Sequence, residues 1–262
     1  MARDIIDDRM IGALHLRALT LSGLTHDEAT AHMAVQSGTL DALMAGGYEG
    51  DTSLGALLRL GTTGIGTVQH LDGELIVLDG AAWAARHDGS IDALEPATLT
   101  PFAVVTHFDP SIEFEVAEPT TLADLRMAID AATPDAPVVA IRVDGAFRDL
   151  ELRSVAPQSP PYPPLSEVVE HQTRWSCARA TGTLVGFRFP DASAGVEVPG
   201  HHLHFLSDDR TVGGHVMSLS VERGRVRLDP ERELHVELPP GVSLGVPGAA
   251  DRDEIERLEG GR

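Results

Sequence analysis

The sequence of 262 residues contains no lysine, because all twenty of its basic residues are arginine. Without a side-chain amine, the protein cannot form a Schiff base with a carbonyl substrate or with pyridoxal phosphate. Any reaction that leaves a carbanion on its substrate therefore needs an electron sink other than a lysine-bound imine.

Cysteine and long apolar runs are also scarce. The only cysteine, Cys177, has no partner for an internal disulfide or for a thiolate zinc site. We interpret it as a small, half-buried apolar residue.

No apolar run is long enough to span a bilayer, and the start MARDIIDDRM is too charged for a secretory signal. We therefore expect a cytoplasmic protein.

Positive charge is in short supply as well. Twenty basic residues stand against 40 acidic ones, which gives a net charge of -20. Such a chain repels nucleic-acid phosphates and anionic lipid, so we expect neither as a partner. The 42% of hydrophobic and 23% of charged residues are typical of a globular protein with one large or two modest domains.

Helical patterns are few. Leucines recur at mixed helical spacings over 10–45, which we interpret as a helix-rich start. Residues 120–133 predict one amphipathic helix, with Thr121 as N-cap and with Leu122, Leu125 and Ile129 on one face. The spacing in 251–261 is helical again.

Short β-type segments fill most of the remaining chain, and 137–155 reads as a hairpin with its turn at Asp144-Gly145. Further strands are expected over 65–73, 74–80, 102–109, 111–116, 182–189, 195–206, 213–222, 224–229 and 233–239. These patterns predict an α+β fold with antiparallel or mixed sheets and few helices. The Pro-rich segment 157–175 would link an N-terminal half, 1–156, to a C-terminal half, 176–262.

Four of the twelve histidines lie in PGHHLHFLSDDRTVGGHV, residues 199–216. On a strand, His202 and His204 share one face, and the turn-rich SDDRTVGG would bring His215 opposite them. Three imidazoles converging from paired strands are typical of a catalytic metal site, which keeps one position for water or substrate. The alternative is a set of surface or singly buried histidines. The pattern does not choose zinc over another divalent metal, and it leaves His201 on the other face as a wall residue.

Three motifs extend this pattern: DGEL at 72–75, an arginine followed by Gln and Pro-Tyr over 153–162, and HLHF with the later His215. Together they resemble the alpha-acetolactate decarboxylases. The similar segments are 35–53, 61–80, 101–108, 143–165, 182–190 and 202–216.

The resemblance implies a zinc enzyme, generally a homodimer, that converts 2-acetolactate to acetoin and carbon dioxide. It assigns metal binding to His202, His204 and His215, with the metal site in a cleft of the C-terminal half. It also implies active-site roles for Glu74, Arg153, a C-terminal glutamate and the pocket-lining Thr67. For the C-terminal glutamate, Glu259 fits best, with Glu256 and Glu254 as rivals.

The chemistry of acetolactate agrees with this assignment. Loss of carbon dioxide leaves an electron pair that the adjacent ketone must accept, and a zinc ion chelated by the hydroxyl and ketone oxygens would stabilise the resulting enediolate. Arg153 would orient the carboxylate, and Glu74 would move a proton. Without the resemblance, both would read as solvent-exposed residues.

Two other functions fit the histidine pattern. A cupin-like metal oxygenase or isomerase also places HxH and a later histidine on strands, and it usually adds a carboxylate where Asp208 and Asp209 stand. A non-catalytic module with a zinc-stapled hairpin would need a fourth protein ligand, but neither Glu74 nor Arg153.

Overall fold

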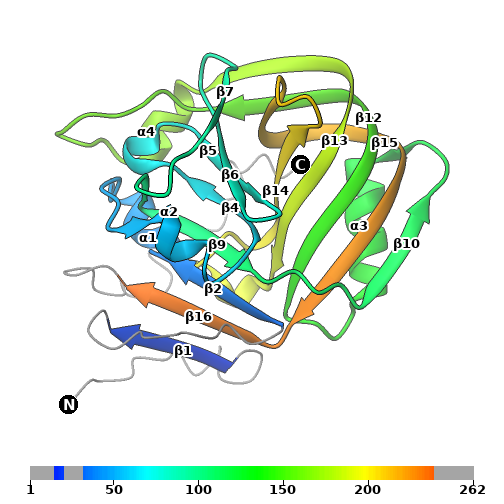
Figure 1. Cartoon of the computed structure of the whole chain (residues 1–262), viewed down its shortest axis with the longest axis horizontal. Helices are drawn as coiled ribbons and strands as arrows, with labels where there is room; N and C mark the ends of the chain where they lie inside the picture. The colour runs from blue at the N-terminus through cyan, green and yellow to red at the C-terminus, as the bar shows by residue number, and fades with distance from the viewer. Residues whose placement is uncertain (1–14, 21–31, 239–262) are drawn as a thin grey trace.

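The computed structural model describes residues 15–20 and 32–238, and within these two ranges the protein is built mainly from β-strands (Figure 1). The larger sheet has eight strands in the order β1 (His15–Thr20), β16 (Glu233–Leu238), β2 (Met33–Ser37), β9 (Phe102–Thr106), β4 (Thr63–Thr67), β5 (Glu74–Leu78), β6 (Ala81–Ala85) and β7 (Ile91–Ala93). Strand β16 runs parallel to both β1 and β2, and the other neighbours are antiparallel. The predicted mixed sheet is confirmed.

The second sheet has six strands and contains the longest ones. They are β10 (Ile112–Val116), β15 (Gly213–Glu231), β12 (Val138–Ser154), β13 (Thr173–Phe189), β14 (Gly200–Ser207) and the short β11 (Thr120–Thr121) beside β15. Because β15 also pairs with β14, the strands β12 to β15 close on one another. A two-stranded ribbon, β3 (Thr52–Ser53) with β8 (Leu99–Thr100), completes the set.

Helices are few and short in the described ranges. They are α1 (Leu40–Met44), α2 (Leu54–Leu57), α3 (Leu122–Ala132) and α4 (Leu165–Glu170), with 3-10 turns at Gln69–Leu71 and Asp191–Ser193. The α3 helix confirms the prediction, since the Thr121 hydroxyl accepts from the Asp124 amide. Leu125 and Ile129 pack with β12 and β15. None of the described helices is both long and apolar enough to cross a membrane.

The two sheets pack through a shared apolar core. Ile65, Ile76 and Val104 of the eight-stranded sheet cluster with Val185 and Phe187 of the six-stranded sheet. Burial of these side chains stabilises the packing by roughly 1.5–3 kcal/mol each. The packing of this core therefore fixes the positions of the strands that carry the site described below.

The sheets do not follow the order of the chain. The strand β12 comes before the Pro-rich segment but pairs with β13 and β15, whereas β16 near the C-terminus pairs with β1 and β2. The division into 1–156, 157–175 and 176–262 stays a prediction about the units of the chain. The predicted α+β class with two sheet regions and few helices is confirmed.

The helix-rich start predicted for 10–45 is wrong in the described ranges. Strands occupy His15–Thr20 and Met33–Ser37, and the one helix of the region, α1, has only five residues. All five residues of β2 are buried, and a short buried segment of this kind has no periodicity that separates a strand from a helix.

The hairpin turn predicted at Asp144-Gly145 is also wrong, because both residues lie inside the continuous strand β12. A Cβ at position 145 would meet the carbonyl oxygen of Arg223. The glycine therefore permits close approach of β15 rather than a turn. The strands predicted over 213–222 and 224–229 likewise form the single strand β15, and the predicted helical segment 251–261 lies outside the described residues.

Candidate metal centre and active site

The three predicted metal ligands meet where β14 pairs with β15. His202 and His204 are two residues apart on β14, and His204 is the direct cross-strand partner of His215. The ring centroids are 5.0 to 5.4 Å apart. One nitrogen from each ring lies within 4.8 Å of the other two, and the residues are only 7%, 0% and 2% exposed.

Gly214, directly before His215, shapes this approach. Gly214 has a φ of +146°, and a Cβ there would lie 2.9 Å from the Trp175 ring and 3.0 Å from the Arg153 carbonyl oxygen. A side chain at this position would push β15 away from β12. The glycine therefore lets His215 stand close to both neighbouring strands.

A backbone hydrogen bond orients the ring of His204. Its Nδ1 lies 2.9 Å from the carbonyl oxygen of Leu75 on β5, and because a carbonyl only accepts, Nδ1 carries the proton. The lone pair of a neutral ring is then on Nε2, 3.4 Å from the Glu74 carboxylate. Metal-binding histidines usually donate their second nitrogen in this way.

The electrostatics keep the rings of His202 and His204 neutral. Burial, and then the positive charge of Arg153, lowers the pKa of His202 to about 3. Burial is also the main reason why the pKa of His204 lies well below its ordinary value. Neutral imidazoles offer lone pairs to a cation at physiological pH. The buried triad therefore fits a divalent metal ion, and its donor set does not identify which one.

Glu74 and Arg153 lie beside the histidines. Glu74 is the first residue of β5, and Arg153 is near the end of β12, where it pairs directly with His215. A guanidinium nitrogen of Arg153 lies 3.4 Å from Oε1 of Glu74, while Oε2 faces His204. Both side chains are buried. The fold thus gathers a carboxylate, a guanidinium and the triad, which the sequence separates by up to 141 positions (Glu74 to His215).

Thr67 is also at this site. It ends β4, is the cross-strand partner of Glu74, and donates its hydroxyl proton to the Gly73 carbonyl oxygen at 3.1 Å. Thr67 is among the residues that line the pocket.

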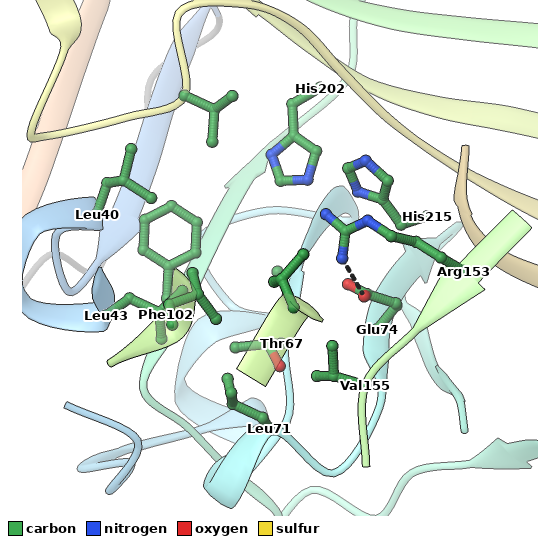
Figure 2. Close-up of a pocket in the computed structure, with 14 residues that line it drawn as sticks. Leu40, Leu43, Thr67, Leu71, Glu74, Phe102, Arg153, Val155, His202 and His215 are labelled. Atoms are coloured by element: carbon green, nitrogen blue, oxygen red, sulfur yellow. Dashed lines mark hydrogen bonds and ion pairs between the residues drawn. The ribbon is translucent and has the colours of Figure 1, made fainter. Parts of the chain in front are cut away.

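The pocket has a polar side and an apolar side (Figure 2). Glu74, Arg153, His202 and His215 lie on one side, and Leu40, Leu43 and Phe102 face them from the other. Further apolar lining comes from Leu71, Val155, Leu165, Val169 and Val198. The arrangement suits a small molecule with polar oxygens at one end and an alkyl group at the other.

Sequence reasoning missed this apolar side and the carbonyl of Leu75. The wall residues belong to short elements, α1 and α4 among them, and their patterns do not differ from ordinary core. A backbone carbonyl gives no signal in a sequence. Only the position of Leu75 directly after Glu74 in DGEL pointed to this segment.

The other predicted residues divide into two groups. Glu254, Glu256 and Glu259 lie outside the described residues. The interpretation of His201 as a wall residue of this pocket is wrong. Its ring points away from the pocket, and its Nε2 lies 3.4 Å from the carboxylate of Asp130 on α3. It faces a separate surface depression.

The acidic residues that an oxygenase would need also lie elsewhere. Asp208 and Asp209 are exposed, and Asp209 accepts hydrogen bonds from Ser207 and Thr211 in the turn between the strands. Among the described residues, the compact ligand group comprises the three histidines.

The fold and the site define a β-rich protein with a buried three-histidine centre beside a half-apolar pocket. Residues 35–243 match the family model described as alpha-acetolactate decarboxylase. The chain is 42% identical over 225 residues to the alpha-acetolactate decarboxylase of Methylococcus capsulatus, covering 85% of this chain and 86% of that one. With the enzyme of Klebsiella aerogenes it shares 38% over 205 residues, 78% of this chain and 79% of the other.

A solved structure agrees. The crystal structure of alpha-acetolactate decarboxylase from Bacillus subtilis strain 168 superposes with a TM-score of 0.83 at 32% identity, over 87% of this chain and 99% of that one. The protein therefore belongs to the alpha-acetolactate decarboxylase family.

Proposed function

We propose that the protein decarboxylates 2-acetolactate to acetoin and carbon dioxide, with His202, His204 and His215 holding a divalent metal ion, zinc in the first place. The observation that carries the proposal is the buried triad beside Glu74 and Arg153, in a chain of this family. When bound, such an ion supplies Lewis-acid stabilisation of negative charge on the substrate oxygens.

Arg153 binds the substrate at its carboxylate end. Its planar guanidinium matches a carboxylate, and it is buried at the polar side of the pocket. The apolar side receives the methyl groups and excludes water. These contacts hold the bond between the carboxyl carbon and the hydroxyl-bearing carbon in position for cleavage.

Glu74 acts as the general base and acid of the reaction. Cleavage releases carbon dioxide and leaves an electron pair, which moves into the neighbouring ketone and is then protonated at carbon. The carboxylate of Glu74, held by Arg153 and next to His204, is placed to take a proton from the substrate hydroxyl and return it to carbon. Solvent supplies the one further proton that is consumed when the acetolactate anion becomes neutral acetoin and carbon dioxide. Thr67 lines the pocket beside it, and we assign a second proton-transfer role to Glu259, with Glu256 and Glu254 as alternatives.

The proposal also covers the oligomeric state and the cellular compartment. We expect a homodimer, which light scattering would report as twice the 27.9 kDa of one chain. We keep the cytoplasm as the predicted compartment.

Metal analysis of the purified protein, combined with an acetoin assay on racemic acetolactate, tests the function. We expect about one divalent ion per chain, which the three-ligand site requires, and acetoin production that chelators abolish and zinc restores. Iron with oxygen-dependent turnover would instead support the oxygenase. Bound metal without acetoin would support the zinc-stapled module.

A further inference from the structure

The apolar side of the pocket is assembled from segments that are far apart in the sequence. Leu40 comes from α1, and Val198 comes from the segment that leads into β14 and His202. Two backbone hydrogen bonds join these segments: the Leu40 amide donates to the Val196 carbonyl at 3.0 Å, and the Asp41 amide donates to the Gly195 carbonyl at 2.8 Å.

The side chain of Gln36 is tied into the same junction. It projects from β2 and is 0% exposed. Its Nε2 donates to the Val196 carbonyl at 2.7 Å and to the Gly38 carbonyl at 2.9 Å. One carbonyl, that of Val196, therefore accepts from both Gln36 and Leu40.

Through these hydrogen bonds, Gln36 connects β2 to the start of α1 and to the segment before β14. Gln36 does not line the pocket, so it can act on a ligand only through the wall residues. Each buried hydrogen bond lost would leave a carbonyl without that donor in a dry environment, which favours movement of the segment that carries it.

We propose that Gln36 is a positioning residue that fixes the spacing between Leu40 and Val198, and thereby the fit of the alkyl end of the substrate. This inference rests on the proposed function. It assigns Gln36 no part in holding the metal or in moving a proton, because the residue reaches neither the triad nor Glu74 through any described contact.

Gln36→Met tests the proposal, since it keeps the length of the side chain and removes both donors. We expect KM for acetolactate to rise about tenfold, as for the loss of one or two buried hydrogen bonds. The kcat should stay within about threefold, and metal content should be unchanged. Hydrogen exchange should speed up at the Leu40 amide and stay unchanged in β4.

Thr106→Val is the matched control, because Thr106 is buried in the neighbouring strand β9 and does not line the pocket. It should leave KM for acetolactate unchanged, whatever it does to thermal stability. Gln36→Asn, which is one methylene too short to hold both carbonyls, serves if the methionine variant does not fold.

An unchanged KM with lower thermal stability would overturn the proposal, because Gln36 would then be purely structural. A fall in kcat together with loss of metal would also overturn it. If the wild-type protein makes no acetoin, the proposed function fails, whereas faster exchange at Leu40 in the variant would still show that Gln36 holds the wall.

Discussion

Arg153 and His215 are direct partners across the β12–β15 pair, and His215 is in turn the direct partner of His204 on β14. Directly paired residues on neighbouring strands present their side chains to the same face. One row across three strands therefore carries a guanidinium and two imidazoles, and Glu74 approaches the row from the other sheet. A shift of one residue in either register would turn part of this row away from the pocket.

The alternation of faces on β14 gives the first prediction. His202→Asn should weaken metal binding by at least about 100-fold, because even partners beyond the ligands change affinity by about 10- to 100-fold. His201→Asn should keep the metal, since His201 lies next to it in sequence but faces Asp130. Metal content after dialysis against a weak chelator measures both. Equal loss in the two variants would mean that the strand, not the ring, is responsible.

Arg153→Lys keeps the positive charge where we place the substrate carboxylate, but it removes the planar guanidinium group. We expect KM to rise by about 10-fold or more, as for the loss of a charged hydrogen bond. Arg174→Lys is the matched control, because Arg174 is the exposed cross-strand neighbour of Arg153 on β13. Steady-state kinetics on both variants provides the measurement, and an unchanged KM in the first would remove Arg153 from substrate binding.

Glu74→Gln removes the group to which we assign proton transfer. The kcat should fall by about 100- to 10,000-fold, the usual contribution of a general acid or base. Metal content should stay near that of the wild type, because the triad is intact. Glu115→Gln, an exposed glutamate on β10, should leave kcat unchanged. If metal and kcat are lost together in the Glu74 variant, the carboxylate serves the metal site rather than the proton.

Features of the fold and the site could be predicted from the sequence where they depend on residues close together in the chain, but not where they depend on distant ones. The period of two in HLHF predicted that His202 and His204 share a face, and turn residues predicted the return of His215. The amphipathic α3 helix was equally local. Where a buried environment decided the outcome, local signals failed: β2 looked helical, and Asp144-Gly145 looked like a turn. The Leu75 carbonyl and the apolar wall required the tertiary fold.

Glu231, the last residue of β15, gives a prediction about pH. Burial, and then the charge of Asp229, raises its pKa to about 8. The folded protein therefore binds a proton that the unfolded chain releases near pH 4.5, the ordinary value for the group. Stability from this group is present below the unfolded pKa and is lost as pH rises through the folded pKa.

Glu231→Gln should remove this dependence, because an amide stays neutral. Between about pH 6 and pH 9, the wild type should lose more free energy of unfolding than the variant, by on the order of a few kcal/mol. Urea unfolding of the metal-loaded protein at both pH values measures the difference. Parallel losses in the two proteins would show that the proton on Glu231 is not the cause.

The C-terminal glutamates give the last prediction. Among the described residues that line the pocket, Glu74 is the one carboxylate, so a second proton relay would come from Glu259 or its rivals. Deleting 251–262 should reduce kcat by about 100-fold, in the range of a general acid or base, but change Tm by only a few degrees. Glu259→Gln should reproduce the loss, while Glu254→Gln and Glu256→Gln should not. Equal losses of activity and stability in the truncated protein would reduce the tail to a packing element, because a proton donor affects turnover without holding the fold.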